Sequence, residues 1–183
     1  MQVGDVRPFT VDVPQAELDD LRDRLARTRW PDAETVDGWD QGVPLAYARD
    51  LAGWWADGYD WRACEARINA LPNFLVEVDG LDIHLIHVRS ANPAARPLLL
   101  THGWPGSVLE FLDVVEPLSR DFHLVIPSLP GYGFSGKPAR AGWNVERIAR
   151  AWDALMVALG YPRYFAQGGD WGSAVTSAIG AQD

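Results

Sequence analysis

Gly168-Gly169-Asp170-Trp171-Gly172-Ser173 is the stretch that decides the fold of this chain. It follows a short apolar run, residues 164–166, and precedes a helix-like run, residues 174–179. A sharp strand-to-helix turn needs small residues two positions before and two after its central residue, because the backbone crowds itself there. Gly168 and Gly172 meet this requirement. The pattern therefore predicts a nucleophile elbow with Asp170 as the nucleophile.

The residue at the centre of such an elbow is usually a serine, and a carboxylate there predicts different chemistry. A carboxylate that attacks a saturated carbon forms an alkyl ester. Taken alone, Gly-Gly-Asp-x-Gly favours an ordinary turn. Its place between a strand and a helix, together with a His-Gly-Trp-Pro loop upstream, favours the elbow. Ser173 lacks small neighbours at the required offsets, so a serine esterase is excluded.

The periodicity of apolar residues changes along the chain. Helical spacing predicts helices over residues 14–29, from residue 44 onward and over residues 61–70. Period-two alternation around Asp79-Gly80 predicts a β-hairpin. Beyond it, short apolar strands alternate with helices, which is typical of parallel βαβ units. We expect an α/β protein in which residues 1–72 form an N-terminal helical segment and residues 73–183 form the first half of an α/β core, a hairpin plus parallel strands up to the elbow.

Composition excludes several classes of partner. The chain has 183 residues, 48% of them hydrophobic and 22% charged, and a net charge of -9. That balance is typical of a globular protein and argues against nucleic acid and anionic membranes as partners. Cys64 is the only cysteine, so a disulfide framework and a cysteine metal cluster are excluded. The longest apolar runs fall short of the roughly 18 residues of a membrane span, so we expect a cytoplasmic protein.

Three loops leave the carboxyl ends of predicted strands: residues 102–107, residues 131–135 and the elbow itself. In a parallel sheet these ends meet at one edge, where ligands bind. An elbow nucleophile works with two backbone N–H groups that hold an oxyanion, one directly after the nucleophile and one from an earlier loop. The candidates here are the N–H groups of Trp171 and Trp104.

The rest of the first loop is expected to line the same pocket. We assign His102, Gly103 and Pro105 to it, with His102 as a structural hydrogen-bonding residue and not a general base. Pro105 also raises the hypothesis that the bond between it and Trp104 is cis. His84 is separated from His87 by three positions on a strand, so the two face opposite sides and predict no joint metal site.

Together these motifs resemble those of one known family, the microsomal-type epoxide hydrolases of the α/β-hydrolase fold. The resemblance covers nearly the whole chain, and is carried by Trp30-Pro31, residues 39–44, Tyr59-Asp60-Trp61-Arg62, Glu65, Asn69, Pro72, Phe74, Asp79-Gly80 with His84 and His87, residues 102–107 and residues 168–173. It implies that Asp170 attacks an epoxide carbon and that the resulting ester is hydrolysed to a vicinal diol. It also implies that Trp104 and Trp171 supply the oxyanion hole, and that the enzyme uses no metal or organic cofactor.

In that family a charge-relay acid, a catalytic histidine and two lid tyrosines follow the elbow. Here all four histidines precede Asp170 and the sequence ends thirteen residues after it. We therefore expect the 183-residue chain to lack turnover by itself. Residues 163–167 would form an exposed sheet edge, which favours self-association or binding of a complementing fragment. A haloalkane-dehalogenase-like hydrolase, which also places Trp after an elbow Asp, and a non-catalytic remnant stay open as alternatives. The long N-terminal segment favours the epoxide hydrolase.

Overall fold

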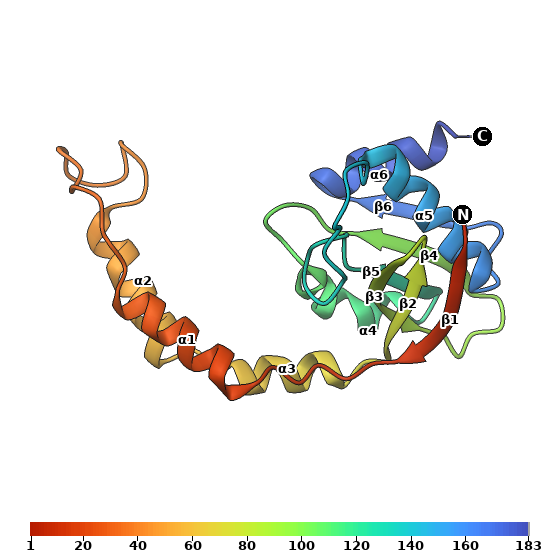
Figure 1. The fold of residues 1–183 in the computed structure, drawn as a ribbon, viewed down its shortest axis with the longest axis horizontal. Helices are drawn as coiled ribbons and strands as arrows, with labels where there is room; N and C mark the ends of the chain where they lie inside the picture. Colours follow the sequence, from red (N-terminus) through yellow and green to blue (C-terminus); the bar gives the residue numbers. More distant parts are fainter. Residues whose placement is uncertain (183) are drawn as a thin grey trace. The chain divides into compact units, whose positions relative to one another are not determined.

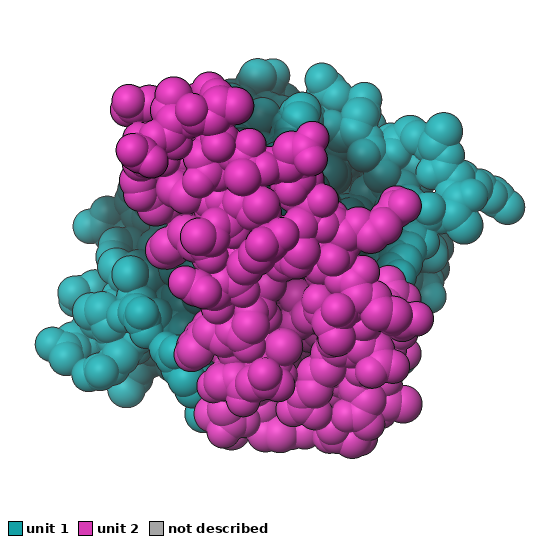
Figure 2. Space-filling model, turned by 90° about the vertical axis from the view of Figure 1, so that its left-hand side faces the viewer, with its two compact units in different colours: residues 1–11, 67–183 teal, residues 12–66 magenta. Residues whose placement is uncertain are grey.

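The computed structural model describes residues 1–182 and divides the chain into two compact units. Unit 1 consists of Met1–Val11 and Arg67–Asp183, and unit 2 of Asp12–Ala66. Figure 2 shows unit 1 in teal and unit 2 in magenta. The nucleophile candidate and the whole sheet belong to unit 1.

Unit 1 is built on a mixed sheet of six strands in the order β1-β2-β3-β5-β4-β6 (Figure 1). The pairs β1/β2, β2/β3 and β3/β5 are antiparallel, whereas β4 pairs in parallel with both β5 and β6. Asp79 and Gly80 form the predicted hairpin turn, with φ of 53° and 79°. The strands are β1 (Val3–Pro8), β2 (Asn73–Val78), β3 (Leu81–Val88), β4 (Arg96–Thr101), β5 (Phe122–Pro127) and β6 (Phe165–Gly168).

The first of these strands is absent from the sequence-based prediction. Residues 1–72 were expected to be helical, but Val3–Pro8 pairs antiparallel with β2, with Pro8 opposite Phe74. The pattern VGDVRP lies at the sheet edge and is mostly exposed, so it carries no apolar alternation that would have revealed a strand. The other edge of the sheet is formed by β6, as expected.

Helices cover both faces of the sheet, because the inner strands are apolar at successive positions. On one face Leu99 and Val125 pack with Trp152 of α5 and Val175 of α6. On the other face Leu100 and Leu124 pack with Val115 of α4, and Figure 1 shows α4 opposite α5 and α6. The helices are η1 (Val108–Phe111), α4 (Leu112–Leu118), α5 (Val145–Ala158) and α6 (Trp171–Gly180). The predicted α/β layering is confirmed.

A buried histidine on β3, His84, links β2 to the segment that follows β5. His84 is fully buried, and its Nε2 lies 3.0 Å from Asn73 Oδ1 while its Nδ1 lies 2.9 Å from Ser128 Oγ. The amide nitrogen of Asn73 donates to the carbonyls of Ile68 and Leu71, so its Oδ1 is free to accept from His84. His84 is therefore neutral, donating through Nε2 and accepting from the Ser128 hydroxyl. Burial lowers its pKa to about 4.

This histidine makes the stability of the fold depend on pH. The unfolded state binds a proton near pH 6.5, whereas folded His84 binds it near pH 4. The contribution of His84 to the free energy of unfolding is therefore fully present above pH 6.5. It is lost as the pH drops toward 4, by on the order of 3 kcal/mol. Urea unfolding of the parent and of His84→Gln at several pH values measures it. We expect a shallower pH dependence in the variant, and equal slopes would contradict the assignment.

Unit 2 contains α1 (Gln15–Ala26), α2 (Leu45–Asp57) and the first part of α3 (Trp61–Asn69). Pro14 and Pro44 occupy the positions just before α1 and α2, as the sequence predicts. Glu65, nearly buried, joins the segment before α1 to α3: its Oε1 accepts from the N–H of Val13 at 2.8 Å and its Oε2 pairs with Arg62 at 2.7 Å.

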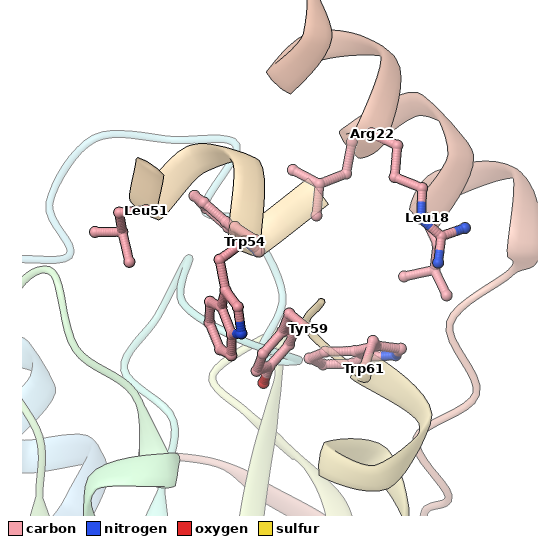
Figure 3. Close-up of a pocket in the computed structure, with 8 residues that line it drawn as sticks. Leu18, Arg22, Leu51, Trp54, Tyr59 and Trp61 are labelled. Carbon is pink, nitrogen blue, oxygen red and sulfur yellow. The ribbon is translucent and has the colours of Figure 1, made fainter. Parts of the chain in front are cut away.

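A groove on unit 2 is lined by aromatic side chains. Figure 3 shows Trp54, Tyr59 and Trp61 close to Leu18 and Arg22 of α1 and Leu51 of α2. Trp54 contacts the Tyr59 ring edge-on with centroids 5.6 Å apart. Neither α1 nor α2 has a buried residue, and Trp54 is 56% exposed. A pair of helices by itself does not enclose a side chain as large as an indole ring. None of the helices that the structure describes is long and apolar enough to cross a membrane.

Candidate active site

Asp170 lies at the tight turn between β6 and α6, as the elbow motif predicts. Its backbone has φ 51° and ψ -125°, a conformation that non-glycine residues rarely adopt and that costs roughly 1–3 kcal/mol. Such strain persists only where the surrounding structure enforces it, and it is concentrated at functional sites. Asp170 lines an open depression together with Gly103, Trp104 and Glu110.

The flanking glycines are required by close backbone contacts. A Cβ at Gly168 would strike the carbonyl group of Gly172. A Cβ at Gly172 would strike the carbonyl of Thr101 and lie 2.7 Å from that of His102. The start of α6 therefore presses directly on the end of β4, which is the crowding that the sequence pattern implied.

The structure brings the first predicted loop against Asp170. The N–H of Trp104 donates to Asp170 Oδ1 at 2.8 Å, although 66 residues separate the two in sequence. Gly103 makes room for the carboxylate, since a Cβ there would lie 2.5 Å from Asp170 Cβ and 2.6 Å from its Oδ1. The Trp104–Pro105 bond is cis, as hypothesised. Pro105 lines the depression with them.

The backbone N–H groups of Trp104 and, second, of Trp171 hold the pKa of Asp170 below its ordinary value. The Trp104 N–H, one of the two predicted oxyanion donors, therefore points at the carboxylate. Trp104 is 65% and Trp171 55% exposed. The lowered pKa favours the ionised carboxylate of Asp170.

This lowered pKa is directly measurable. We expect carbon-detected NMR titration of Asp170 to give a pKa below that of the same residue in the urea-unfolded chain. The depressed pKa favours folding above the ordinary carboxyl range, and this contribution is lost as pH falls through the folded value. Equal values in the folded and unfolded chain would show that neither N–H binds the carboxylate.

His102 lies beside the site but does not face it as a base. The ring is 1% exposed, its Nδ1 lies 2.9 Å from the Gly103 carbonyl, and its Nε2 lies 3.0 Å from the N–H of Leu129. Both nitrogens are engaged, which agrees with the structural role expected for it. The other predicted loop, residues 131–135, contributes no residue to this depression.

One pocket residue escaped sequence analysis. Glu110, four positions after Gly106, brings its carboxylate over that glycine, where a Cβ would collide with Glu110 Oε1. The spacing of one helical turn was the available signal, but only the folded loop shows which way it points. Among the described residues no group of histidine, cysteine and carboxylate side chains fits a metal ion.

Comparison with known proteins places this geometry in a family. The profile described as "Epoxide hydrolase N terminus" matches residues 6–111, and the profile "alpha/beta hydrolase fold" matches residues 96–183. A Stigmatella aurantiaca protein, provisionally named an epoxide hydrolase, is 52% identical over 185 residues, covering 95% of this chain and 42% of that protein. Epoxide hydrolase 1 of Sus scrofa is 35% identical, covering 93% of this chain and 40% of its own.

Solved structures agree. The Aspergillus niger epoxide hydrolase superposes with a TM-score of 0.88 at 36% identity, covering 97% of this chain and 49% of that one. The juvenile hormone epoxide hydrolase of Bombyx mori gives a TM-score of 0.86 at 33% identity, covering 98% of this chain and 50% of its own. The chain thus spans two fifths to one half of the proteins it matches.

Proposed function

The chain belongs to the epoxide hydrolase family, and from that premise we propose that Asp170 opens an epoxide by attacking one of its carbons. The observation that carries the proposal is a carboxylate at a strained elbow that accepts a hydrogen bond from the backbone N–H of Trp104 at 2.8 Å. A new bond joins a carboxylate oxygen to the carbon as the carbon–oxygen bond of the epoxide breaks. The electron pair goes to the epoxide oxygen, which takes up a proton. The product is a hydroxyalkyl ester of Asp170.

Hydrolysis of that ester would complete the reaction. Water adds to the ester carbonyl carbon, and the N–H groups of Trp104 and Trp171 hold the resulting oxyanion. Collapse breaks the bond to the alkyl oxygen, which leaves with a proton as the diol, and restores the carboxylate. Opening an epoxide in this way removes an electrophile, so a detoxifying role is part of the proposal.

Ester hydrolysis needs a base, and the four histidines of the described residues are engaged elsewhere. His84 and His102 have both ring nitrogens in hydrogen bonds. His87 pairs with the Tyr161 hydroxyl at 3.0 Å, and His123 accepts from the N–H of Ser90 at 3.0 Å. Without a general base hydrolysis slows by roughly 10²–10⁴-fold. We therefore propose that this chain by itself stops at the ester.

Intact-mass analysis after incubation with styrene oxide tests both statements. We expect slow addition of one epoxide per chain, located on Asp170 by peptide mapping, with no more diol than chain. Failure to find any adduct would refute the nucleophile. Diol in many-fold excess over chain, lost in Asp170→Asn, would instead refute the stalled ester and leave the nucleophile standing.

The free edge of the sheet supports a second proposal, about association. Within the part of the chain that the structure describes, β6 pairs on one side, with β4, and Phe165 on this strand is 49% exposed. An unpaired apolar edge favours pairing with another chain. We propose that the chain self-associates, or binds a complementing fragment, through β6. Light scattering after size exclusion should give more than one chain per particle, and a stable monomer at all concentrations would argue against it.

We also propose a role for each of the two segments of the chain. Residues 1–72 would act as the N-terminal segment typical of the family, and residues 73–183 as the first half of the hydrolase core. The match of the epoxide hydrolase N-terminal profile to residues 6–111 supports an epoxide as substrate over a haloalkane.

A further inference from the structure

The chemistry of His102 follows from its two partners. The N–H of Leu129 can only donate, so His102 Nε2 must accept from it at 3.0 Å. The carbonyl of Gly103 can only accept, so Nδ1 must carry the proton that it donates at 2.9 Å. His102 is therefore neutral with its proton on Nδ1. Burial lowers its pKa, which favours this neutral form.

The partner of Nδ1 is one end of the peptide group that faces Asp170. The carbonyl of Gly103 and the N–H of Trp104 belong to the same planar unit, with oxygen and hydrogen on opposite sides. Fixing the oxygen therefore fixes the direction of the N–H. That N–H is the one that reaches Asp170 Oδ1 at 2.8 Å.

This peptide group would otherwise be free to turn. Residue 103 must be glycine, because a Cβ would lie 2.5 Å from that of Asp170. Glycine, however, populates far more backbone conformations than any other residue. Glycine at position 103 thus makes room for Asp170, but it also leaves the peptide group that carries the Trp104 N–H less restrained. The histidine next to it in sequence, held 1% exposed, restores that restraint.

The anchor of the histidine lies in a different loop. Leu129 follows β5, whereas His102 follows β4, and the two strands are parallel neighbours. The hydrogen bond from Leu129 therefore ties the ring to the loop that follows the neighbouring strand β5. The ring also contacts Tyr132 with centroids 5.5 Å apart.

We propose that His102 is a positioning residue, whose Nδ1–H holds the Gly103 carbonyl and so aims the Trp104 N–H at Asp170. Its effect on Asp170 is independent of substrate, while its effect on ester hydrolysis rests on the proposed function. Protonation would place two N–H groups against each other at Leu129, so the hydrogen bond from Leu129 forms only with neutral His102.

Three substitutions separate the two hydrogen bonds. In His102→Asn the amide nitrogen lies where Nδ1 was and keeps the donor to Gly103. In His102→Gln the side chain can accept the hydrogen bond from the Leu129 N–H but cannot donate to the Gly103 carbonyl. In His102→Phe both hydrogen bonds are lost. His84→Gln is the matched control, since it removes another buried histidine of unit 1 whose side-chain partners, Asn73 and Ser128, lie outside residues 102–107.

The first readout is the pKa of Asp170 by NMR titration, which needs no epoxide. We expect the parent, His102→Asn and His84→Gln to keep the depressed value, and His102→Gln and His102→Phe to rise toward the unfolded one. A folded His102→Phe with unchanged pKa would overturn the proposal. So would an equal rise in His84→Gln or in His102→Asn. Should His102→Phe fail to fold, the comparison of Asn with Gln decides.

The second readout is release of the Asp170 ester by hydroxylamine, which passes through the same oxyanion. Loss of one aligned donor costs about 10²-fold in such a step. We expect that loss in His102→Gln and His102→Phe and parent-like release in His102→Asn. Parent-like release in all three would overturn the role in hydrolysis. If no variant forms an ester, the proposed function fails while the pKa series still decides the restraint.

Discussion

Asp170→Asn is expected to lower the rate of ester formation with styrene oxide by at least about 10⁴-fold, the largest effect on activity that we predict. The amide carries no charge, so its oxygen is a far weaker nucleophile than a carboxylate. It can still accept a hydrogen bond from the Trp104 N–H, and the side chain is solvent-exposed. The variant should therefore fold normally, and the loss should be purely chemical.

Asp153→Asn is the matched control for this experiment. Asp153 lies on α5, where it accepts a hydrogen bond from the Tyr164 hydroxyl at 3.0 Å, and it does not line the depression around Asp170. It removes the same charge and should leave the rate of adduct formation unchanged. An adduct that forms equally fast in Asp170→Asn and maps to another carboxylate would mean that styrene oxide reacts non-specifically, and the assignment of Asp170 would fail.

Gly172→Ala should cause the largest loss of stability, about 3 kcal/mol or more in urea unfolding. The added Cβ would meet the carbonyl of Thr101, and it would lie 2.7 Å from the carbonyl of His102. Both are backbone atoms at the end of β4. This strand pairs with β5 on one side and β6 on the other, so it cannot shift to relieve the clash. Relief would require α6 to move away, carrying Asp170 with it.

Gly169→Ala provides the comparison at the neighbouring elbow position. No heavy atom lies within 4 Å of a Cβ built there, so the side chain meets open space. We expect a change within about 1 kcal/mol. If Gly172→Ala were as stable as Gly169→Ala, the contact between α6 and β4 would not constrain the elbow, and the physical reading of the Gly-Gly-Asp-x-Gly motif would be wrong.

Much of the fold could be predicted because it is encoded locally. The strand Leu81–Val88 and its Asp79-Gly80 turn were identified from alternation and turn chemistry alone. The edge strand Val3–Pro8 was missed, since its exposed residues carry no period. Trp54 on α2 is mostly exposed, because the exposure of a helix residue depends on what covers the helix and not on the helix's own sequence pattern.

The candidate site divides in the same way. Asp170 was identified from six consecutive residues, whereas Glu110 was not, because the direction of its side chain over Gly106 exists only in the folded loop. His102 was assigned a structural role from sequence, but the identity of its partners came from the structure.

By itself, then, the sequence determined the elbow, its carboxylate and the two glycines that flank it, because all of these stand in one short stretch of the chain. Only the tertiary structure decided that the Trp104 N–H reaches Asp170 across 66 residues, and that His102 fixes the peptide group that carries it. The physical reason is the strand order β5-β4-β6, which brings three loops distant in sequence to one end of the sheet. Local patterns fix what each loop contains, and the order of the strands fixes what it touches.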